Sequence, residues 1–248
     1  MNGVSEMEHD REYWDRIWKG NGGFDENVFF ECVVDSIIDN MGGSVAGRRI
    51  LEAGAGTGTS SLQLARRGAI PTLVDYSPVA IEKMQDMFER NSIPAVFLLN
   101  DIRRMDAENN SFDLVFNAGV MEHFSYEEQV RILREMKRVC KDTGRIIVLT
   151  PNARCLFYRL LKWLLETNGT WPWGPEQPVV SLLRQFNEAG LKVVREYSVG
   201  FLESLEHLAC IKNTEGIVSL LRSFYYALPA EDKNLFEGYL VCTVGAKT

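Results

Sequence analysis

The sequence lacks the cysteine patterns of disulfide-bonded small secreted proteins and the clustered ligands of common metal sites. Its five cysteines are scattered along 248 residues, their number is odd, and none forms a Cys-x-x-Cys pair. It has three histidines, with no His-x-x-x-His pattern, and no carboxylate cluster stands out in the sequence. These absences argue against a disulfide framework and against a zinc site. We therefore expect a reduced, cytoplasmic protein that holds no metal.

Long apolar runs and an excess of basic residues are also missing. No stretch approaches the length of a membrane span, and the polar segment 1–10 does not resemble a signal peptide. The net charge is −7, from 27 basic and 34 acidic residues, which offers no broad attraction to a phosphate backbone. We therefore expect no transmembrane segment and no nucleic-acid partner. The length and the hydrophobic fraction of 46% fit one large α/β domain.

Glycine, in contrast, is concentrated in one stretch that organises the chain. A short apolar run leads into an acid, Glu52, and glycines then alternate at Gly54, Gly56 and Gly58. Leucines at helical spacing follow, up to Gly68. This pattern predicts a strand, a tight turn and a helix. Since glycine allows close approach of a ligand and a helix N-terminus presents unpaired N–H groups, the stretch predicts a nucleotide-type cofactor site.

Two details distinguish this turn from a dinucleotide-binding loop. The dinucleotide fingerprint is Gly-x-Gly-x-x-Gly/Ala, but Thr59 stands at its third position here. The carboxylate of Glu52 would repel a pyrophosphate, whereas it suits a cationic or zwitterionic group. The segment from Glu52 to Gly58, which includes Ala55, resembles motif I of the class I S-adenosylmethionine-dependent methyltransferases, in the branch that acts on small molecules. In that family the glycines pass under the methionine half of S-adenosylmethionine (SAM), which carries a sulfonium and an amino group.

Two further acids follow the next two predicted strands. Asp75 lies about 20 residues beyond the glycines, where an acid binds a ribose diol in many doubly wound folds. Tyr76 comes next and is expected to pack on the adenine. The resemblance implies that Asp101 accepts from the adenine amino group, and that the backbone N–H of Ile102 meets the ring. A helix-capping acid at Asp75 and a surface-turn acid at Asp101 are the structural alternatives.

The fourth predicted strand, 112–116, leads into a candidate active-site floor. Its continuation through Asn117 and Ala118 to Glu122 and His123 resembles motif IV of the same family. Ligands of open α/β sheets bind at the carboxyl ends of the strands, so Asn117 and Ala118 are expected at the cofactor and Glu122 at the acceptor. His123 is the candidate general base, because an unperturbed imidazole titrates near pH ~6.5. In the alternative, Glu122 and His123 merely cap the helix that follows.

Four such motifs in order over residues 50–151 carry the resemblance, and it implies a Rossmann-like, doubly wound α/β fold. We expect a mostly parallel seven-stranded sheet with helices on both faces and an antiparallel last strand. Strands are expected near 50–52 and at 70–74, 95–99, 112–116, 145–150, 191–199 and 239–245. Helices are expected at 13–18, 25–40, 77–91, 126–140, 156–165, 180–189 and, with an interruption, 201–228. A single domain, 1–248, would carry a helical lid at 1–45 and acceptor-side insertions at 153–180 and 200–235.

The aromatic helix at the N-terminus has two readings of nearly equal weight. Aromatic and apolar residues repeat at helical spacing at Tyr13, Trp14, Ile17 and Trp18, and residues 19–23 break the helix. The helix either docks its aromatic face on the core or closes over the cofactor as a lid, as this segment often does in the resembled family. In the lid reading, Tyr13 and Trp18 contact SAM.

A second aromatic segment, 153–178, follows the fifth predicted strand. Tyr158, Trp171 and Trp173 would line a roof over the acceptor and favour a flat or greasy molecule, aromatic or lipid-like. The apolar helix within it could also rest on a membrane surface. Burial against the domain or a dimer partner is the favoured alternative to membrane contact.

The function expected from these patterns is SAM-dependent methyl transfer to a small molecule, at oxygen rather than nitrogen or carbon, with S-adenosylhomocysteine as product. No Asn-Pro-Pro-Tyr-like tetrad and no Pro-Cys pair follows the fourth strand. These absences disfavour the amino-methylating DNA and glutamine branches and cytosine C5 methylation. Two alternatives stay open: a SAM-binding protein without catalysis, and an NAD-type oxidoreductase, which would leave Asp101 unexplained.

Overall fold

A seven-stranded sheet forms the centre of the molecule in this computed structural model, which describes residues 11–20 and 27–247. The strand order is β3-β2-β1-β4-β5-β7-β6. Strand β7 runs antiparallel to both of its neighbours, and the remaining neighbouring strands pair in parallel. The predicted doubly wound fold with an antiparallel last strand is therefore confirmed. The strands are β1 (Arg49–Ala53), β2 (Ile70–Asp75), β3 (Val96–Leu99), β4 (Phe112–Ala118), β5 (Cys140–Pro151), β6 (Leu191–Val199) and β7 (Leu240–Lys247).

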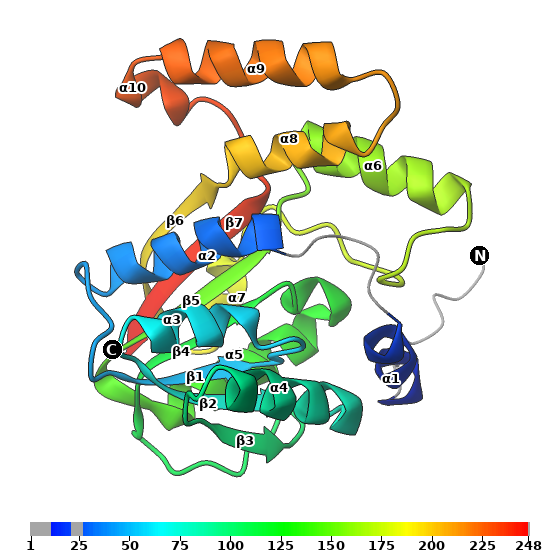
Figure 1. The fold of residues 1–248 in the computed structure, drawn as a ribbon. Helices are drawn as coiled ribbons and strands as arrows, with labels where there is room; N and C mark the ends of the chain where they lie inside the picture. The colour runs from blue at the N-terminus through cyan, green and yellow to red at the C-terminus, as the bar shows by residue number, and fades with distance from the viewer. Residues whose placement is uncertain (1–10, 21–26, 248) are drawn as a thin grey trace, which may run out of the picture.

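Helices cover both faces of this sheet, with α2, α3 and α4 on one face and α5 and α7 on the other (Figure 1). None of the described helices is long and apolar enough to cross a membrane. The helices are α1 (Arg11–Lys19), α2 (Asn27–Asn40), α3 (Thr59–Arg66), α4 (Pro78–Arg90), the 3-10 helix η1 (Met121–His123), α5 (Tyr126–Val139), α6 (Leu156–Thr167), α7 (Leu183–Glu188), α8 (Phe201–Ala209), α9 (Glu215–Ala227) and α10 (Ala230–Lys233).

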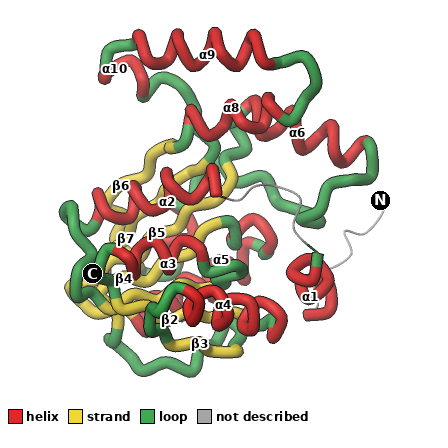
Figure 2. The backbone as a smooth tube through the Cα atoms, viewed as in Figure 1, coloured by secondary structure: helices red, strands yellow, loops and turns green. Residues whose placement is uncertain are grey.

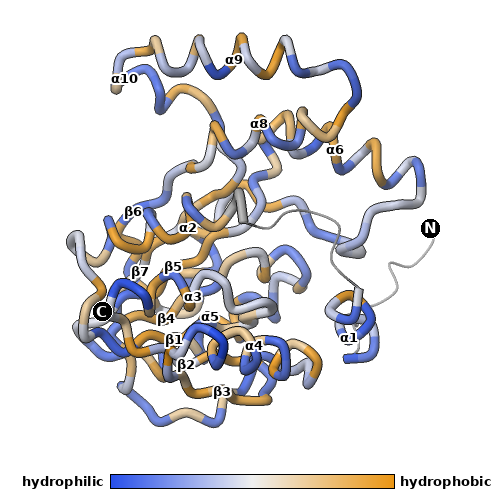
Figure 3. The backbone as a smooth tube through the Cα atoms, viewed as in Figure 1, coloured by the Kyte–Doolittle hydropathy of each residue, from blue (hydrophilic) through white to orange (hydrophobic). Residues whose placement is uncertain are grey.

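Alternate residues of the central strands supply two hydrophobic cores. Leu51 and Val115 pack toward α5 and α7, whereas Ile50, Leu114 and Phe116 pack toward α2 and α3. Parallel strands covered on both faces need apolar residues at successive positions, which is why these segments read as continuous apolar runs. Figure 3 shows this concentration of hydrophobic residues along the central strands.

Several element ends differ from the predicted ones. The helix expected at 180–189 begins only at Leu183, because Val179 forms a β-bridge with Asn152 and keeps the preceding chain extended. Strand β5 begins at Cys140, earlier than expected, since Cys140 already pairs with Phe112 before a register shift. The segment 1–10, expected to be frayed, and the start of the helix expected from residue 25 lie outside the described residues, as does most of the break at 19–23.

The helices α6, α8, α9 and α10 form a helical cap beyond one end of the sheet (Figure 2). Helix α8 packs against both α6 and α9, and its Phe201, Leu205 and Leu208 form a separate small core with Val218 of α9. The predicted interrupted helix at 201–228 is thus the pair α8 and α9. Helix α1 lies away from the cap and packs on α4.

Candidate functional site

The three alternating glycines follow β1 in a left-handed backbone conformation. Their φ angles are 78°, 53° and 70° at Gly54, Gly56 and Gly58, which L side chains rarely adopt. A Cβ at Gly56 would lie 2.8 Å from the ring of Trp18, and a Cβ at Gly58 would lie 2.7 Å from Leu73. Gly56 therefore permits the approach of α1, and Gly58 permits the turn to pack on β2.

Asp75 joins this turn to the start of α4. Its Oδ2 accepts from the Gly56 N–H at 2.9 Å, and its Oδ1 accepts from the Ser77 N–H at 2.9 Å. Burial raises the pKa of Asp75 above its ordinary value, in opposition to these two N–H bonds. The side chain that caps α4 is that of Ser77, which accepts from the Ala80 N–H and precedes Pro78.

A cavity of about 440 Å³ opens beside Asp75, at the carboxyl ends of the strands. We call it the strand-end cavity. It brings together seven residues that the sequence singles out and several that it does not. The expected residues that line it are Gly54, Asp75, Tyr76, Asp101, Ile102, His123 and Trp18, and the unexpected ones include Arg11, Arg103, Val120, Phe124 and Glu128.

Asp101 is not a free carboxylate in this cavity. Arg103 donates to it from Nε at 2.9 and 3.0 Å and from its backbone N–H at 2.8 Å, and Arg103 also donates to Glu128 at 2.7 Å. Although burial alone would raise the pKa of Asp101, the hydrogen bonds and charge of Arg103 hold it below its ordinary value. An amino group that binds Asp101 must therefore share the carboxylate with Arg103.

A second cavity, of about 200 Å³, lies between the sheet and the helical cap. We call it the cap cavity. It is lined by the expected residues Glu52, Ala55, Gly56, Ala118, Glu122, Tyr158, Trp171 and Trp173. The two cavities share Trp14, Trp18, Gly54, Gly119 and His123, so they meet at this point.

Glu52 enters the cap cavity from β1. Its Oε2 accepts from the Ser61 N–H at 3.2 Å, and burial raises the pKa of its carboxyl to about 7. The neighbouring hydroxyl of Ser60 is buried, lines the same cavity and has no hydrogen-bond partner among the described residues. Buried polar atoms normally have partners, so these two side chains suit a polar ligand group at the glycine turn.

Glu122 is buried on the floor of the cap cavity. Its Oε2 accepts from the Thr150 hydroxyl at 2.8 Å, and its Oε1 lies 3.8 Å from Nε2 of His123. Burial, reinforced by the nearby charge of Glu176, raises the pKa of Glu122 to about 8. The capping alternative does not describe these residues, because α5 begins with a capping box of Ser125 and Glu128.

His123 lies at the junction of the two cavities. Its Nδ1 is 3.4 Å from the carbonyl oxygen of Pro175, and the ring of Trp14 meets it edge to face at 4.9 Å. A carbonyl oxygen only accepts hydrogen bonds, so this contact places the hydrogen of the neutral ring on Nδ1. Nε2, on the side of Glu122, is then the basic nitrogen.

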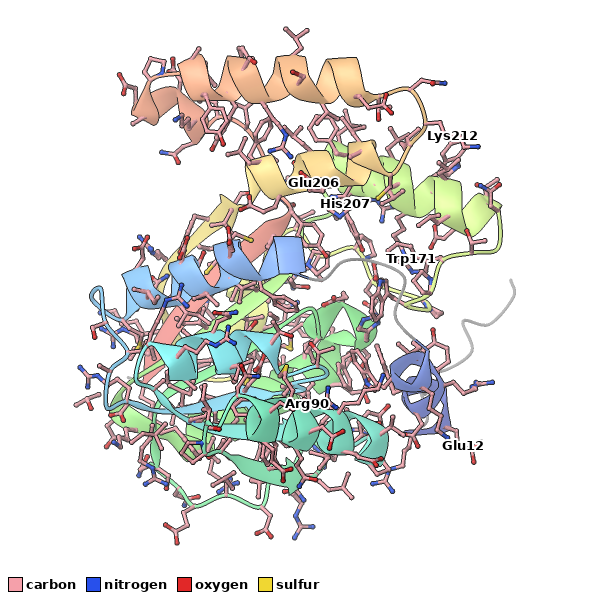
Figure 4. All side chains as sticks on the ribbon, in the orientation of Figure 1. Glu12, Arg90, Trp171, Glu206, His207 and Lys212 are labelled. Carbon is pink, nitrogen blue, oxygen red and sulfur yellow. The ribbon has the colours of Figure 1, made fainter. Side chains whose placement is uncertain are left out.

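Four further residues complete this part of the site, although the sequence does not single them out for it: Glu176, Lys162, His207 and Tyr239. Glu176 accepts from the Tyr158 hydroxyl and lies 3.3 Å from Nζ of Lys162. His207 is buried, with its ring 4.7 Å from that of Tyr239. Figure 4 shows His207 and Trp171 on the side of the cap that faces the sheet. Burial lowers the pKa of His207 to about 4, so its ring is neutral.

The structure also gathers possible metal ligands that the sequence does not reveal. Ligand atoms of Glu122, His123 and Glu176 all lie within 4.8 Å of one another. No sequence pattern indicates this cluster, because it forms only where the segment of Glu122 and His123 meets the distant segment of Glu176. The ammonium of Lys162 already stands beside Glu176 in the position of a cation.

Three expected contact residues, Gly58, Asn117 and Tyr13, line neither cavity. Asn117 is fully buried, and its amide faces the sulfur of Met136 at 3.7 Å in the core behind β4. The hydroxyl of Tyr13 donates to the carbonyl of Pro172 at 3.3 Å, which ties α1 to the loop after α6. We withdraw the side chains of Asn117 and Tyr13 as cofactor contacts. His9 lies outside the described residues.

Known proteins resemble the chain most clearly around these motifs. A family model described as "Methyltransferase domain" matches residues 50–144. Phosphatidylethanolamine N-methyltransferase of Cereibacter sphaeroides is 30% identical over 110 residues, which cover 44% of this chain and 53% of that protein. Magnesium-protoporphyrin O-methyltransferase of Rhodobacter capsulatus is 29% identical over 129 residues, which cover 52% and 55%. The chain thus spans about half the length of these curated relatives.

A solved structure shares the fold over nearly the whole chain. The crystal structure of magnesium protoporphyrin IX methyltransferase from Synechocystis PCC 6803 with bound S-adenosylhomocysteine superposes with a TM-score of 0.61 and 16% identity. The match covers 96% of this chain and 93% of that one. The strand order, the glycine turn and the sequence likeness over β1 to β5 point the same way, so the chain resembles S-adenosylmethionine-dependent methyltransferases in fold and, over residues 50–144, matches a methyltransferase-domain family model.

Proposed function

We propose that this protein transfers the methyl group of SAM to a small-molecule acceptor. The observation that carries the proposal is the meeting of the two cavities at Gly54, Gly119 and His123. A donor in one cavity and an acceptor in the other would face each other at this junction. Such alignment alone can lower a barrier by roughly 7–11 kcal/mol.

The residues around the glycine turn fit SAM. The adenosine half would lie in the strand-end cavity, with Asp75 at the ribose and Tyr76, Asp101 and Ile102 at the adenine. The amino acid half would lie over Gly54 and Gly56, where Glu52 supplies a carboxylate and Ser60 a hydroxyl without a partner among the described residues. The bound cofactor supplies a methyl group on a sulfonium, and the protein aligns it and excludes water.

We propose α1 as the lid of this site, within a single domain. Trp18 covers the turn at Gly56, and the Ser77 hydroxyl donates to Asp15 at 2.5 Å, so α1 contacts both the turn and the start of α4. The segments 153–180 and 200–235, as acceptor-side insertions, close the cap cavity from the opposite side through Trp173 and His207.

For the acceptor atom we propose oxygen, with His123 as the base. The contact between Nδ1 and the Pro175 carbonyl directs Nε2 of the neutral ring to the junction side, where it can take a hydroxyl proton. The named relatives include both an N- and an O-methyltransferase, so the choice of oxygen depends on this side chain. A cytoplasmic location, as the composition suggests, belongs to the same proposal.

Two measurements test this function. Titration calorimetry with S-adenosylhomocysteine and with NAD distinguishes a methyltransferase from an NAD-type oxidoreductase, and we expect binding of the former alone. Incubation with SAM and an acceptor library, with S-adenosylhomocysteine release as readout, then tests turnover. Binding of the cofactor without release of product from any acceptor would favour the non-catalytic alternative. Preference for NAD would overturn the proposal.

A further inference from the structure

The charged residues that line the cap cavity are all acidic. Of the described residues around it, none is a lysine or an arginine, whereas the carboxylates of Glu52, Glu122 and Glu176 all border it. Glu52 lies at the glycine turn, so Glu122 and Glu176 are the acids left for the acceptor. An acceptor with a carboxylate or phosphate would be repelled by this lining.

The carboxylate of Glu122 is buried and borders the cavity. The Thr150 hydroxyl donates to Oε2, and Oε1 lies 3.8 Å from Nε2 of His123, beyond hydrogen-bond distance. A Cβ built on Gly119 would lie 3.6 Å from this Oε1, and Gly119 borders both cavities. Glu122 is only 3% exposed, so a further hydrogen bond to Oε1 would come from a molecule in the cavity rather than from bulk water.

The buried charges around Glu122 do not balance. Against the two carboxylates of Glu122 and Glu176 stands one buried ammonium, Lys162, which is 3.3 Å from Glu176 and 2.9 Å from the half-exposed Glu166. His207 adds no positive charge, because burial lowers the pKa of its ring to about 4. A buried charge is stable only when paired, so the cluster retains a proton when empty or accepts a cation.

The walls of the cavity suit a cation as well. Tyr158, Tyr239 and Trp171 border it, and aromatic faces attract ammonium groups. The protein already uses this arrangement on itself, because Nζ of Lys162 lies 4.1 Å from the ring centroid of Trp171 while it contacts Glu176. A second ammonium beside Glu122 would repeat the same combination of ring and carboxylate.

We propose that the methyl acceptor carries a protonated amine, which enters the cap cavity and donates a hydrogen bond to Oε1 of Glu122. This inference rests on the proposed function, since it assigns the cap cavity to the acceptor. It specifies the charged group by which the acceptor is recognised, not the atom that is methylated. It also narrows the expected flat or greasy acceptor to an amine with an apolar body.

A divalent metal ion would be a different occupant of the same cluster. The ammonium of Lys162 and the hydroxyl of Tyr158 both contact Oε2 of Glu176, so this oxygen already has a cation and a donor. A second and doubly charged cation would lie close to Lys162 and repel it. The amine is therefore the occupant that the surroundings favour, and dependence on a metal becomes an outcome of the test.

The test is titration calorimetry on the full chain saturated with S-adenosylhomocysteine. The probes are benzylamine, 2-phenylethylamine and butylamine, with 2-phenylethanol and phenylacetate as neutral and anionic partners of equal shape. We expect 2-phenylethylamine to bind at least about tenfold more tightly than 2-phenylethanol, because one charge-assisted hydrogen bond distinguishes them. Phenylacetate should not bind. Titrations in phosphate and in Tris at pH 7 should show that amine binding releases protons from the cluster.

Variants distinguish Glu122 from its neighbours. Glu122→Gln should reduce the preference of the amine over the alcohol to about threefold or less and abolish proton release. Glu166→Gln is the matched control, because Glu166 contacts Lys162 but does not line the cavity, and the preference should persist. Unchanged S-adenosylhomocysteine affinity in Glu122→Gln would show that the variant folds.

Several results would contradict the proposal that the acceptor carries a protonated amine. They are equal affinity for amine and alcohol, binding of phenylacetate, an unchanged preference in Glu122→Gln, binding that requires added Mg²⁺, and no binding of any amine probe by protein that binds S-adenosylhomocysteine. Failure of the proposed function looks different, since S-adenosylhomocysteine itself would then not bind. If an alcohol binds and is methylated while the amines do not bind, the protein is a methyltransferase, but its acceptor is not recognised by a protonated amine.

Discussion

At the scale of single residues, substitution of Asp75 should affect both the affinity for the cofactor and the stability of the fold. Asp75→Ala removes the proposed ribose acceptor and should weaken SAM binding by about 1–3 kcal/mol. It also leaves the N–H groups of Gly56 and Ser77 without their acceptor, so the free energy of unfolding should fall. Calorimetry with S-adenosylhomocysteine and thermal unfolding measure the two effects. Unchanged affinity in a folded variant would rule out the ribose role.

Glu122 should make the stability of the protein depend on pH. Its pKa in the folded protein is raised to about 8, well above the ordinary value of 4.5, so the folded state favours its neutral form. This stabilisation is complete below pH 4.5, where Glu122 is protonated in both the folded and the unfolded state, and it is lost as the pH rises from 4.5 to about 8. Glu122→Gln fixes the neutral form, so its melting temperature should fall less between pH 5 and pH 9 than that of the wild type. Parallel curves for the two proteins would contradict the raised pKa.

The same residues show how far the sequence determines the site. Glu52, Asp75 and Asp101 follow strands within recognisable motifs, so their neighbourhood was predictable before the fold was known. Glu176 and His207 lie in segments without a motif, and only the packing of the cap brings them to Glu122. Arg103 was also unforeseen, since the sequence does not tell whether the Asp101 carboxylate faces a ligand or a neighbouring guanidinium.

At the scale of elements, the sequence determines helices best where a cap fixes the end. Ser77 with Pro78 begins α4, and α5 ends within one residue of the predicted helix. The α7 helix was predicted too long because its start depends on a tertiary bridge between Val179 and Asn152, which no local pattern encodes. For the apolar α6, burial was favoured, and the structure buries Tyr158, Leu161 and Lys162 while it leaves Trp163 exposed.

The contact between α1 and the glycine turn predicts the effect of a larger residue at Gly56. Gly56→Val should abolish cofactor binding, because the added side chain lies where the cofactor is proposed to pass and 2.8 Å from Trp18. The affected atoms belong to the far end of a side chain on α1, so the sheet should stay folded while α1 is displaced, with a lower free energy of unfolding because valine is strained at a φ of 53°. Calorimetry and circular dichroism measure the two effects. Gly216→Val is the control, since nothing lies within 4 Å of that position; cofactor binding by Gly56→Val would contradict the proposed path.

At the scale of the whole molecule, the cap cavity depends on both the sheet and the helical cap. Strands supply Glu52 and Leu240, and the cap supplies Tyr158 and His207, so the site is complete only when both parts are folded. If the chain is a single domain, as we propose, sheet and cap should unfold in one cooperative transition. A first, ligand-independent transition of the cap alone would instead make it a separate unit.

Cofactor binding tests whether the sheet and the cap unfold together, because a ligand of the folded state stabilises every part that unfolds with its site. S-adenosylhomocysteine at about one hundred times its dissociation constant should add about 2.7 kcal/mol to the free energy of unfolding. For a domain of this size, each kcal/mol raises the melting temperature by about 2–4 °C, so a single calorimetric transition should move up by roughly 5–11 °C. NAD at the same concentration should leave it in place. Helices α8 and α9 contain no proposed cofactor contact. If the melting temperature of these helices also rises when the cofactor binds, the cap unfolds together with the glycine turn at the opposite side of the cavity.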